Sequence, residues 1–367
     1  MISKRLQKLN PYKPGEQPND RKYIKLNANE NPYPASPKAT KAVKTVSNKK
    51  MGLYPDPESI DLKKAIATML NECNGVLVPA DNQPNLPFSI TEDMIFCGNG
   101  SDEVLSFVFY AFFDDDKPVV IPEHTYSFYP VYAGYYQIPL EKIPLNEDFS
   151  IDKEKMVTTD STGIIFANPN APTGKNLSSD EIEQMLKSYP SDKVFVVDEA
   201  YADFSGHTVL PLLAKYSNLL IIRTFSKSMA FAGMRLGFAV GSPELIKALT
   251  TAKNSFNHFP IDRLCQAAGI AACTDSAWYK KNCRKIMQTR DFFQSELQKA
   301  GWTVLPSQTN FVLAGKPGKT GKEVYEAIKK QGILVRYFDI DTIRDYVRIS
   351  IGTDSQMKQL LQIMKEL

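Results

Sequence analysis

The sequence has few of the residues that mark metal-binding or disulfide-bonded proteins. Five cysteines and three histidines occur in 367 residues, namely Cys73, Cys97, Cys265, Cys273, Cys283, His124, His207 and His258. The cysteines are odd in number, widely spaced and without a C-x-x-C pair, which argues against a disulfide framework and a zinc site. Because the histidines are also scattered, we expect no metal site.

The chain also lacks an excess of charge of one sign and a long apolar run. Its 44 basic residues oppose 41 acidic ones, for a net charge of +3, which gives no reason to expect a nucleic acid or membrane partner. No window reaches the roughly 18 apolar residues of a membrane span, and the first residues lack the apolar region of a signal peptide. We therefore expect a cytoplasmic protein. Small anions remain possible ligands, because single arginines bind phosphate whatever the total charge.

What is present is a pattern of alternating strands and helices. Short, continuous apolar runs predict strands at 94–97, 118–121, 163–167, 194–197, 219–224 and 236–240. Such runs, separated by helical segments, indicate a mainly parallel sheet with helices on both faces. The last third has separated helices and short alternating strands, which is typical of a smaller α+β domain. We predict a large domain over 36–255 and a small domain over 256–367, preceded by an arm.

The arm, residues 1–35, is polar and rich in Pro and Asn. We expect little secondary structure in it, and we expect it to pack on the small domain or on a partner subunit. Apolar residues at helical spacing predict helices near 62–70, 277–299 and 357–364. Ser178, with Glu181 three residues later, has the spacing of a capping box.

One lysine lies shortly after the end of a predicted buried strand. Lys227 comes after Thr224-Phe225-Ser226 and the apolar run 219–222. A desolvated lysine loses its proton readily, which suits Schiff-base chemistry with a carbonyl cofactor. A surface lysine that extends from a strand end explains this stretch equally well, so both interpretations stay open on these residues alone.

Polar residues follow the other predicted strands too, where ligands of such sheets bind. The glycine-containing segment 98–103 can hold a phosphate at a helix N-terminus, or simply cap the helix. Asp198 can keep a pyridine nitrogen protonated, or cap the next helix. Segment 168–174 forms either a rigid binding loop or a plain turn. Arg235 can share a phosphate with Ser226, or form a surface ion pair.

As an ordered set, these motifs resemble the fold-type I pyridoxal-phosphate-dependent aminotransferases. The set is Gly-Ser-Asp at 100–102, Asn-Pro-x-x-Pro-Thr-Gly at 168–174, Asp-Glu-Ala-Tyr at 198–201 and Ser-Lys at 226–227, followed by arginine 235. Within that family, the chain is similar to the histidinol-phosphate aminotransferases over 26–32, 54–57, 98–103, 335–338 and 348–353. The resemblance implies an α/β fold whose large domain has a mainly parallel (mixed) seven-stranded sheet between helices, with a smaller α+β domain.

The resemblance also implies the cofactor, pyridoxal 5′-phosphate, and its ligands. Lys227 would form the Schiff base and then move the substrate's proton, Asp198 would pair with the pyridinium nitrogen, and Tyr201 would bind the ring oxygen O3′. The other implied cofactor contacts are Gly100, Ser101, Asp102, Tyr126 stacked on the ring, Asn170, Thr224, Ser226, Arg235 and Tyr54. In this family the tyrosine matching Tyr54 reaches the partner subunit's cofactor, which implies a homodimer.

The substrate residues implied by the resemblance are Tyr12, Asn29, Arg336 and Arg348, with the arginines binding a phosphate or carboxylate. There is one departure from the family pattern. The family usually has Asn directly before Pro-Thr-Gly, and its amide meets O3′, but the residue here is Ala171. Asn170 lies one position earlier, where its side chain should point another way. Tyr201 alone, or a water, would then serve O3′.

The activity implied is amino transfer from L-histidinol phosphate to 2-oxoglutarate, which gives imidazole acetol phosphate and L-glutamate in histidine biosynthesis. An aromatic amino-acid aminotransferase and a threonine-phosphate decarboxylase share the same scaffold and remain alternatives. A cofactor-binding regulator without turnover is a further alternative. Such regulators usually carry a DNA-binding domain, and no extra basic domain fits before residue 27.

Overall fold

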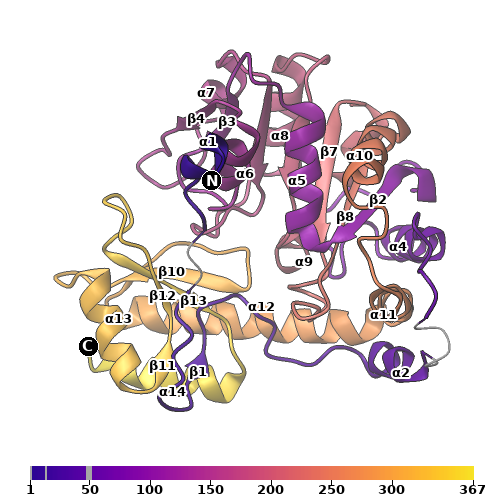
Figure 1. The fold of residues 1–367 in the computed structure, drawn as a ribbon. Helices are drawn as coiled ribbons and strands as arrows, with labels where there is room; N and C mark the ends of the chain where they lie inside the picture. The colour runs from indigo at the N-terminus through magenta and orange to yellow at the C-terminus, as the bar shows by residue number, and fades with distance from the viewer. Residues whose placement is uncertain (1, 13–14, 47–51) are drawn as a thin grey trace.

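Two sheets organise the chain, as Figure 1 shows for a computed structural model that describes residues 2–12, 15–46 and 52–367. The larger sheet has seven strands and the smaller one has four. The long helix α12 (Ser276–Lys299) runs beside both parts (Figure 1). This arrangement confirms the predicted α/β class, with a mainly parallel seven-stranded sheet and a smaller α+β part.

The seven-stranded sheet is mixed, as expected. Its order is β2 (Ile95–Asn99), β8 (Leu236–Gly241), β7 (Leu219–Thr224), β6 (Phe195–Asp198), β5 (Gly163–Ala167), β3 (Val119–Pro122) and β4 (Leu140–Ile143). Strand β8 alone runs opposite to the other six, so its pairings with β2 and β7 are antiparallel and the other pairings are parallel. Six strands match the predicted ones closely. The edge strand β4 was not predicted, because its exposed Glu141 and Lys142 interrupt the apolar run.

Each face of this sheet has its own apolar core. Neighbouring residues of β5 show why: Ile164 and Phe166 belong to one core, and Ile165 between them belongs to the other, since successive strand residues point to opposite faces. One face is covered by α5 (Gly100–Phe112), α6 (Tyr129–Tyr136) and α10 (Pro243–Phe256). The other is covered by α4 (Ile60–Glu72), α7 (Lys153–Thr158) and α8 (Ser179–Ser188). Continuous apolar strands therefore follow from burial on both faces.

The smaller sheet is antiparallel and carries its own helices. Its order is β12 (Arg336–Tyr337), β13 (Tyr346–Ser350), β10 (Phe311–Gly315) and β9 (Thr303–Val304). Helices α13 (Gly321–Lys330) and α14 (Asp354–Lys365) both begin with a capping box, which satisfies amide donors of the first turn. No described helix is long and apolar enough to cross a membrane.

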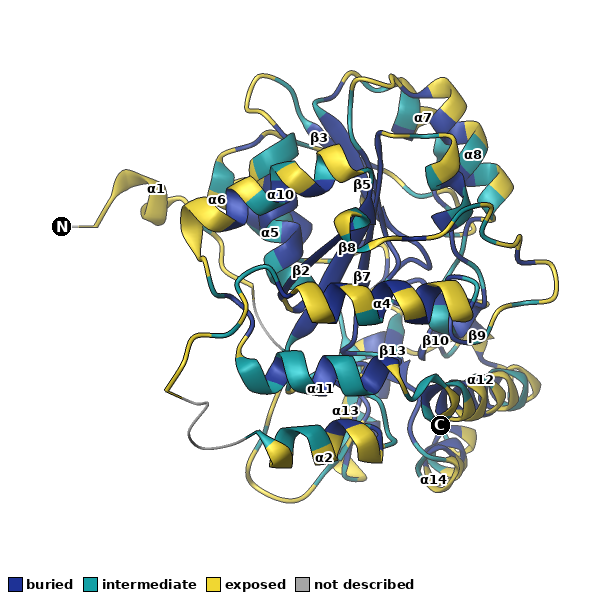
Figure 2. Cartoon of the chain, turned by 90° about the vertical axis from the view of Figure 1, so that its right-hand side faces the viewer, coloured by how far each residue is buried: buried dark blue, intermediate teal, exposed yellow. Residues whose placement is uncertain are grey.

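The remaining elements connect these parts. They are α1 (Lys4–Gln7), β1 (Ile24–Lys25), α2 (Pro37–Thr45), η1 (Glu92–Met94), α9 (Ala202–Ser205), η2 (Leu210–Ala214), α11 (Arg263–Cys273) and β11 (Ile333–Leu334). The described residues of the arm form only the short elements α1 and β1, and β1 pairs in parallel with β11. Helix α11 packs against α2 and α4, with buried residues on the inner sides of all three (Figure 2). The domain division at residues 35 and 255 stays a prediction.

Candidate active site

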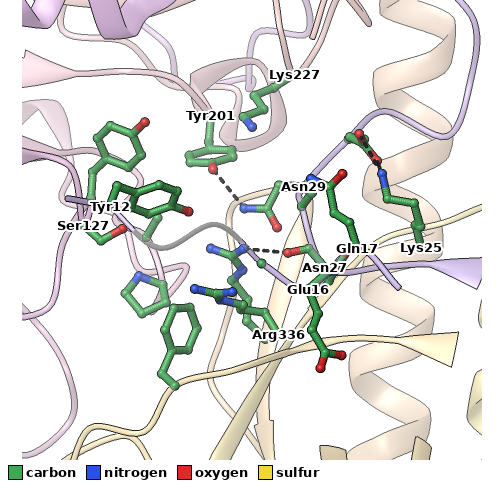
Figure 3. Close-up of a pocket in the computed structure, with 18 of the residues that line it drawn as sticks. Tyr12, Glu16, Gln17, Lys25, Asn27, Asn29, Ser127, Tyr201, Lys227 and Arg336 are labelled. Atoms are coloured by element: carbon green, nitrogen blue, oxygen red, sulfur yellow. Dashed lines mark hydrogen bonds and ion pairs between the residues drawn. The ribbon is translucent and has the colours of Figure 1, made fainter. Parts of the chain in front are cut away.

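Two adjoining cavities lie at the edge of the large sheet, facing the smaller part. The inner cavity is lined by Ser101, Asp102, Tyr126, Asp198, Tyr201, Thr224, Ser226, Lys227 and Arg235, together with four alanines. The outer cavity, drawn in Figure 3, is lined among others by Tyr12, Asn29, Arg336, Phe338 and Arg348. Both cavities share Tyr126, Ala171, Tyr201 and Lys227. They form one continuous site.

The inner cavity is assembled from strand ends. Asp198 is the last residue of β6, and Thr224 is the last residue of the neighbouring β7. Ser101 and Asp102 lie in the first turn of α5, directly after β2. Because these strands are parallel to one another, their carboxyl ends meet at the same edge of the sheet. The expectation that these residues gather at the strand ends is therefore confirmed.

Lys227 lies at the junction of the two cavities, where its side chain points toward the pocket in Figure 3. Its Nζ is 6.0 Å from the centre of the Tyr201 ring. The turn that carries it is held from the N-terminal segment, because Asn31 Nδ2 donates to the carbonyl oxygens of Lys227 at 2.9 Å and Ser228 at 3.1 Å. Of the two interpretations left open by the sequence, the geometry favours a lysine that faces a cavity.

Asp198 is a carboxylate buried among neutral partners. Only 3% of the residue is exposed. Tyr129 donates to its Oδ2 at 2.8 Å, and the backbone N–H of Ala200 donates to its Oδ1 at 3.1 Å. Burial raises the pKa of Asp198 to about 6, although these hydrogen bonds oppose the rise. A cationic ligand in the inner cavity would stabilise the ionised form.

Two glycines on different elements allow close approaches at the end of the inner cavity that carries Ser101 and Arg235. Gly237 lies so near α5 that a Cβ there would be 2.3 Å from the backbone nitrogen of Ser101. Gly100 has a φ of +77°, and a Cβ there would meet the Arg235 guanidinium at 2.5 Å. The two glycines therefore bring the first amides of α5 and the Arg235 side chain to the same place. A helix N-terminus beside an arginine is suited to bind a phosphate.

Asp102 holds two other site residues in place. Arg235 Nη2 lies 3.0 Å from Asp102 Oδ2, and the Tyr126 hydroxyl donates to Oδ1 at 2.6 Å. Burial and the Asp102 charge raise the pKa of Tyr126 well above its ordinary value, so its phenol stays protonated. The carboxylate thus fixes the arginine and the aromatic ring that face the cavity.

The outer cavity has two arginines opposite each other. Arg336 and Arg348 are direct partners in the register of β12 and β13. Their guanidinium groups lie 5.4 and 5.5 Å from the centre of the Phe338 ring, and Arg348 Nη2 donates to the carbonyl oxygen of Asn27 at 3.1 Å. Burial and the Arg336 charge lower the pKa of Arg348. Like charges directly opposite on a sheet are unfavourable, unless an anion binds between them.

Three residues named from the sequence do not line these cavities, as far as the described residues show. The Asn170 amide donates to the carbonyl oxygen of His124 at 2.8 Å and to Thr173 Oγ1 at 3.1 Å, so it braces its own loop. Gly100 acts through backbone shape. Tyr54 is 79% exposed, and its ring stacks on Phe259 with centroids 4.6 Å apart.

Sequence reasoning missed other residues that hold the site. Tyr129 is bound to Asp198 across 69 positions, and Asn31 anchors the Lys227 turn across 196. Neither has a local pattern that could reveal its partner. The other substrate residues named from the sequence, Tyr12 and Asn29, do line the outer cavity.

Comparison with known proteins gives consistent relatives over the whole chain. The family model of class I and II aminotransferases matches residues 21–364. A histidinol-phosphate aminotransferase of Syntrophus aciditrophicus is 49% identical, over 100% of this chain and 98% of that protein. Histidinol-phosphate aminotransferase 2 of Dechloromonas aromatica is 43% identical, over 98% and 96%.

Solved structures agree with these relatives. The histidinol-phosphate aminotransferase of Sinorhizobium meliloti, solved in complex with pyridoxal-5′-phosphate, superposes with a TM-score of 0.84 at 25% identity and covers 100% of this chain and 96% of that one. An aspartate aminotransferase of Thermus thermophilus with maleate has a TM-score of 0.81, with coverage of 100% and 99%. At 18% identity, that second likeness concerns the fold alone.

Proposed function

Because the chain belongs to the class I and II aminotransferases, within their histidinol-phosphate aminotransferase family, we propose that it transfers the amino group of L-histidinol phosphate to 2-oxoglutarate with pyridoxal 5′-phosphate as cofactor. The products are imidazole acetol phosphate and L-glutamate. The observation that carries the proposal is the position of Lys227 at the junction of an inner and an outer cavity.

The inner cavity fits the cofactor. Asp198 supplies the buried anion that a protonated pyridine nitrogen needs, and it has no other cationic partner among the described residues. The amide of Ser101 and the guanidinium of Arg235 supply an anion site for the phosphate. Tyr126 supplies an aromatic face for the ring.

When bound, the cofactor supplies a carbonyl carbon that condenses with amines and a ring that withdraws electrons from the substrate Cα. Lys227 Nζ would hold the cofactor and, once the substrate amine has replaced it there, would be free to act as the base for the proton on the substrate Cα. Asp198 would keep the proton on the ring nitrogen, and Tyr201 would place its hydroxyl toward the ring oxygen. The inner cavity would thus orient the cofactor, with Lys227 placed to move a proton where the cavities meet.

The outer cavity fits a substrate with an anionic group. Arg336 and Arg348 present two guanidinium groups across neighbouring strands, and a phosphate or carboxylate between them relieves their mutual repulsion. Tyr12 and Asn29 line the same cavity. We propose that these four residues bind the amino donor and then 2-oxoglutarate.

We further propose a homodimer. Leu53, Tyr54 and Phe256 are exposed by 63%, 79% and 79%, and Tyr54 stacks on Phe259, so exposed apolar side chains lie on the two segments that this stacking joins. Large exposed apolar patches mark interaction sites. In a homodimer, Tyr54 would reach the phosphate of the partner's cofactor. We place this biosynthetic enzyme in the cytoplasm.

The test is turnover by the purified holoenzyme with each amino donor in turn. L-histidinol phosphate with 2-oxoglutarate should give the highest kcat/KM. Faster turnover of phenylalanine would instead favour an aromatic aminotransferase, and release of carbon dioxide from phosphothreonine would favour the decarboxylase. Lys227→Ala should abolish both turnover and the visible absorption of the bound cofactor, whereas Lys142→Ala, an exposed lysine on β4, should change neither.

A further inference from the structure

The hydroxyl of Tyr201 has a protein partner that comes from the arm segment. Asn29 Nδ2 donates to the Tyr201 hydroxyl at 3.0 Å, across the top of the outer cavity (Figure 3). The two residues are buried, with 2% and 7% of their surface exposed. Because this hydroxyl accepts a hydrogen bond from Asn29, its own hydrogen remains to be donated elsewhere.

The direction of the Asn29 amide is set by Ser350 on β13. The backbone N–H of Asn29 donates to Ser350 Oγ at 2.8 Å, and Ser350 Oγ donates to Asn29 Oδ1 at 3.0 Å. If the Asn29 side-chain amide were flipped, Ser350 Oγ would accept hydrogen bonds from both the backbone N–H and the side-chain NH₂ of Asn29. The hydroxyl hydrogen of Ser350 would then lose Asn29 Oδ1 as its acceptor. Oδ1 therefore faces Ser350, and the N–H donor faces Tyr201.

The backbone of Asn29 is held as firmly as its side chain. Asn310 Nδ2 donates to the carbonyl oxygen of Asn29 at 3.0 Å. Asn29 has a φ of 54°, in the left-handed region that Asn tolerates better than most residues. Its amide, carbonyl and side chain are thus all bound to buried groups, so the donor that faces Tyr201 has a fixed position.

The loop across the cavity offers no second donor of this kind. Ala171 lines both cavities with a methyl group, and the neighbouring Asn170 amide is turned toward His124 and Thr173. Among the described residues, Tyr201 therefore has the side-chain hydroxyl that is placed to bind the ring oxygen of the cofactor from this side. The strength and direction of its hydrogen bond matter more here than in a site with two donors.

We propose that Asn29 is a positioning residue for Tyr201: its amide, oriented by Ser350, directs the phenolic hydrogen toward the cofactor ring oxygen and strengthens that bond. This inference rests on the proposed cofactor chemistry. A hydroxyl that accepts a hydrogen bond becomes a better donor, because the bonds polarise each other. The role comes in addition to the place of Asn29 in the wall of the substrate cavity.

The consequence is a shift in the pH at which the visible absorption of the bound cofactor changes. A donor to the ring oxygen would stabilise negative charge on that oxygen, and so would lower the pH midpoint of the absorption change. Without Asn29, the weaker Tyr201 bond should raise this midpoint. The other titratable groups that line the two cavities are Tyr12, Glu16, Lys25, Glu30, Asp102, Tyr126, Asp198, Arg235, Arg336 and Arg348, which all the variants below keep.

The test is the pH midpoint of the visible absorption of the bound cofactor. Asn29→Ala should raise the midpoint by about 0.5 to 1 unit, the size of one neutral hydrogen bond. Tyr201→Phe should raise it further. The double variant should match Tyr201→Phe alone, because Asn29 acts through Tyr201.

A matched control comes from the same segment. Asn27 lines the same cavity, but its amide donates to the carbonyl oxygen of Glu16 at 3.0 Å, so Asn27→Ala should leave the midpoint unchanged. If Asn29→Ala fails to fold, Asn29→Asp serves instead. Aspartate keeps an acceptor for Ser350 and tolerates the left-handed backbone, but it lacks the N–H group that donates to Tyr201. Its midpoint should also rise.

Additive shifts in the double variant would overturn the proposal, as would a raised KM for the amino donor with an unchanged midpoint. If the visible absorption of the wild-type protein with cofactor is the same in Lys227→Ala, the proposed function is overturned, and this inference with it. A normal wild-type titration with no shift in Asn29→Ala and Asn29→Asp would overturn the inference alone.

Discussion

Tyr129 donates a 2.8 Å hydrogen bond to Oδ2 of Asp198, the carboxylate at the end of β6. Both residues are buried, at 0% and 3% exposure. This bond stabilises the ionised carboxylate and opposes the effect of burial on its pKa. The charge available for the cofactor ring nitrogen therefore depends on a residue of α6, far from Asp198 in sequence.

Tyr129→Phe should weaken cofactor binding. The variant removes a hydrogen bond to a charged group, which contributes about 1.5–3 kcal/mol, so the Kd for pyridoxal 5′-phosphate should rise about tenfold or more. Equilibrium titration of the apoenzyme measures this. Tyr189→Phe is the control, since Tyr189 is also buried and bonds Ser161 at 3.2 Å, away from the site. An equal loss of affinity in both variants would contradict the role of Tyr129.

Asp198→Asn should make the apoenzyme more stable at neutral pH. The folded pKa of Asp198, about 6, lies above its ordinary 3.8, so the folded state holds the proton more tightly than the unfolded chain. Asp198 therefore reduces stability as pH rises from about 4 through about 6, and the penalty is complete above that range. The advantage of the variant should grow by about 1 kcal/mol between pH 5 and pH 8.

Urea unfolding of both apoproteins at the two pH values checks this expectation. If the difference in the free energy of unfolding between Asp198→Asn and the wild type is the same at both pH values, the expectation is contradicted. The holoenzymes should show the reverse order at pH 8, because only the carboxylate can pair with the protonated ring nitrogen.

Gly237→Ala should damage the phosphate end of the site. The new Cβ would lie 2.3 Å from the backbone nitrogen of Ser101, so the first turn of α5 must move. We expect a loss of about 1–3 kcal/mol in the free energy of unfolding, together with weaker cofactor binding. Gly134→Ala is the control, because no heavy atom outside the adjoining backbone of its own helix lies within 4 Å of its Cβ position on α6; it should be neutral or stabilising.

Arg348→Lys should reduce activity although it keeps the charge. A lysine ammonium cannot reproduce the planar fork that binds an anion with two parallel hydrogen bonds. We expect kcat/KM for the amino donor to fall about tenfold to a hundredfold, mainly through KM, as for a loss of about 1.5–3 kcal/mol. Arg344→Lys is the control, since Arg344 pairs with the exposed Asp341 at 3.3 Å. Equal kcat/KM values for Arg348→Lys and the wild type would contradict an anion site at Arg348.

Much of the large domain was predictable because its information is local. Strands covered on both faces must be continuously apolar, so β5, β6 and β7 stand out from the sequence. Where such strands are parallel, the residue after each one must lie at the same edge of the sheet. Asp198 and Lys227 could therefore be placed in one site, and the family resemblance assigned their chemistry.

The parts that could not be predicted depend on partial exposure or on long-range contacts. Strand β4 lies at the sheet edge, so its polar residues hide it. The register of β12 and β13 makes Arg336 and Arg348 direct neighbours, and no spacing along the chain implies that pairing. In the same way, the partners Tyr129 with Asp198 and Asn29 with Tyr201 are 69 and 172 positions apart.

The sequence by itself thus determined the elements, their order and the residue types at the strand ends, since apolar periodicity and turn chemistry act between neighbours. The tertiary structure alone decided which way those side chains face and which hydrogen bonds orient them. Side-chain direction follows from packing between segments that are distant in the chain, and no local pattern records it. Lys227, Asn29 and Tyr201 could all be named from the sequence, but the hydrogen bond that joins the Asn29 amide to the Tyr201 phenol could not.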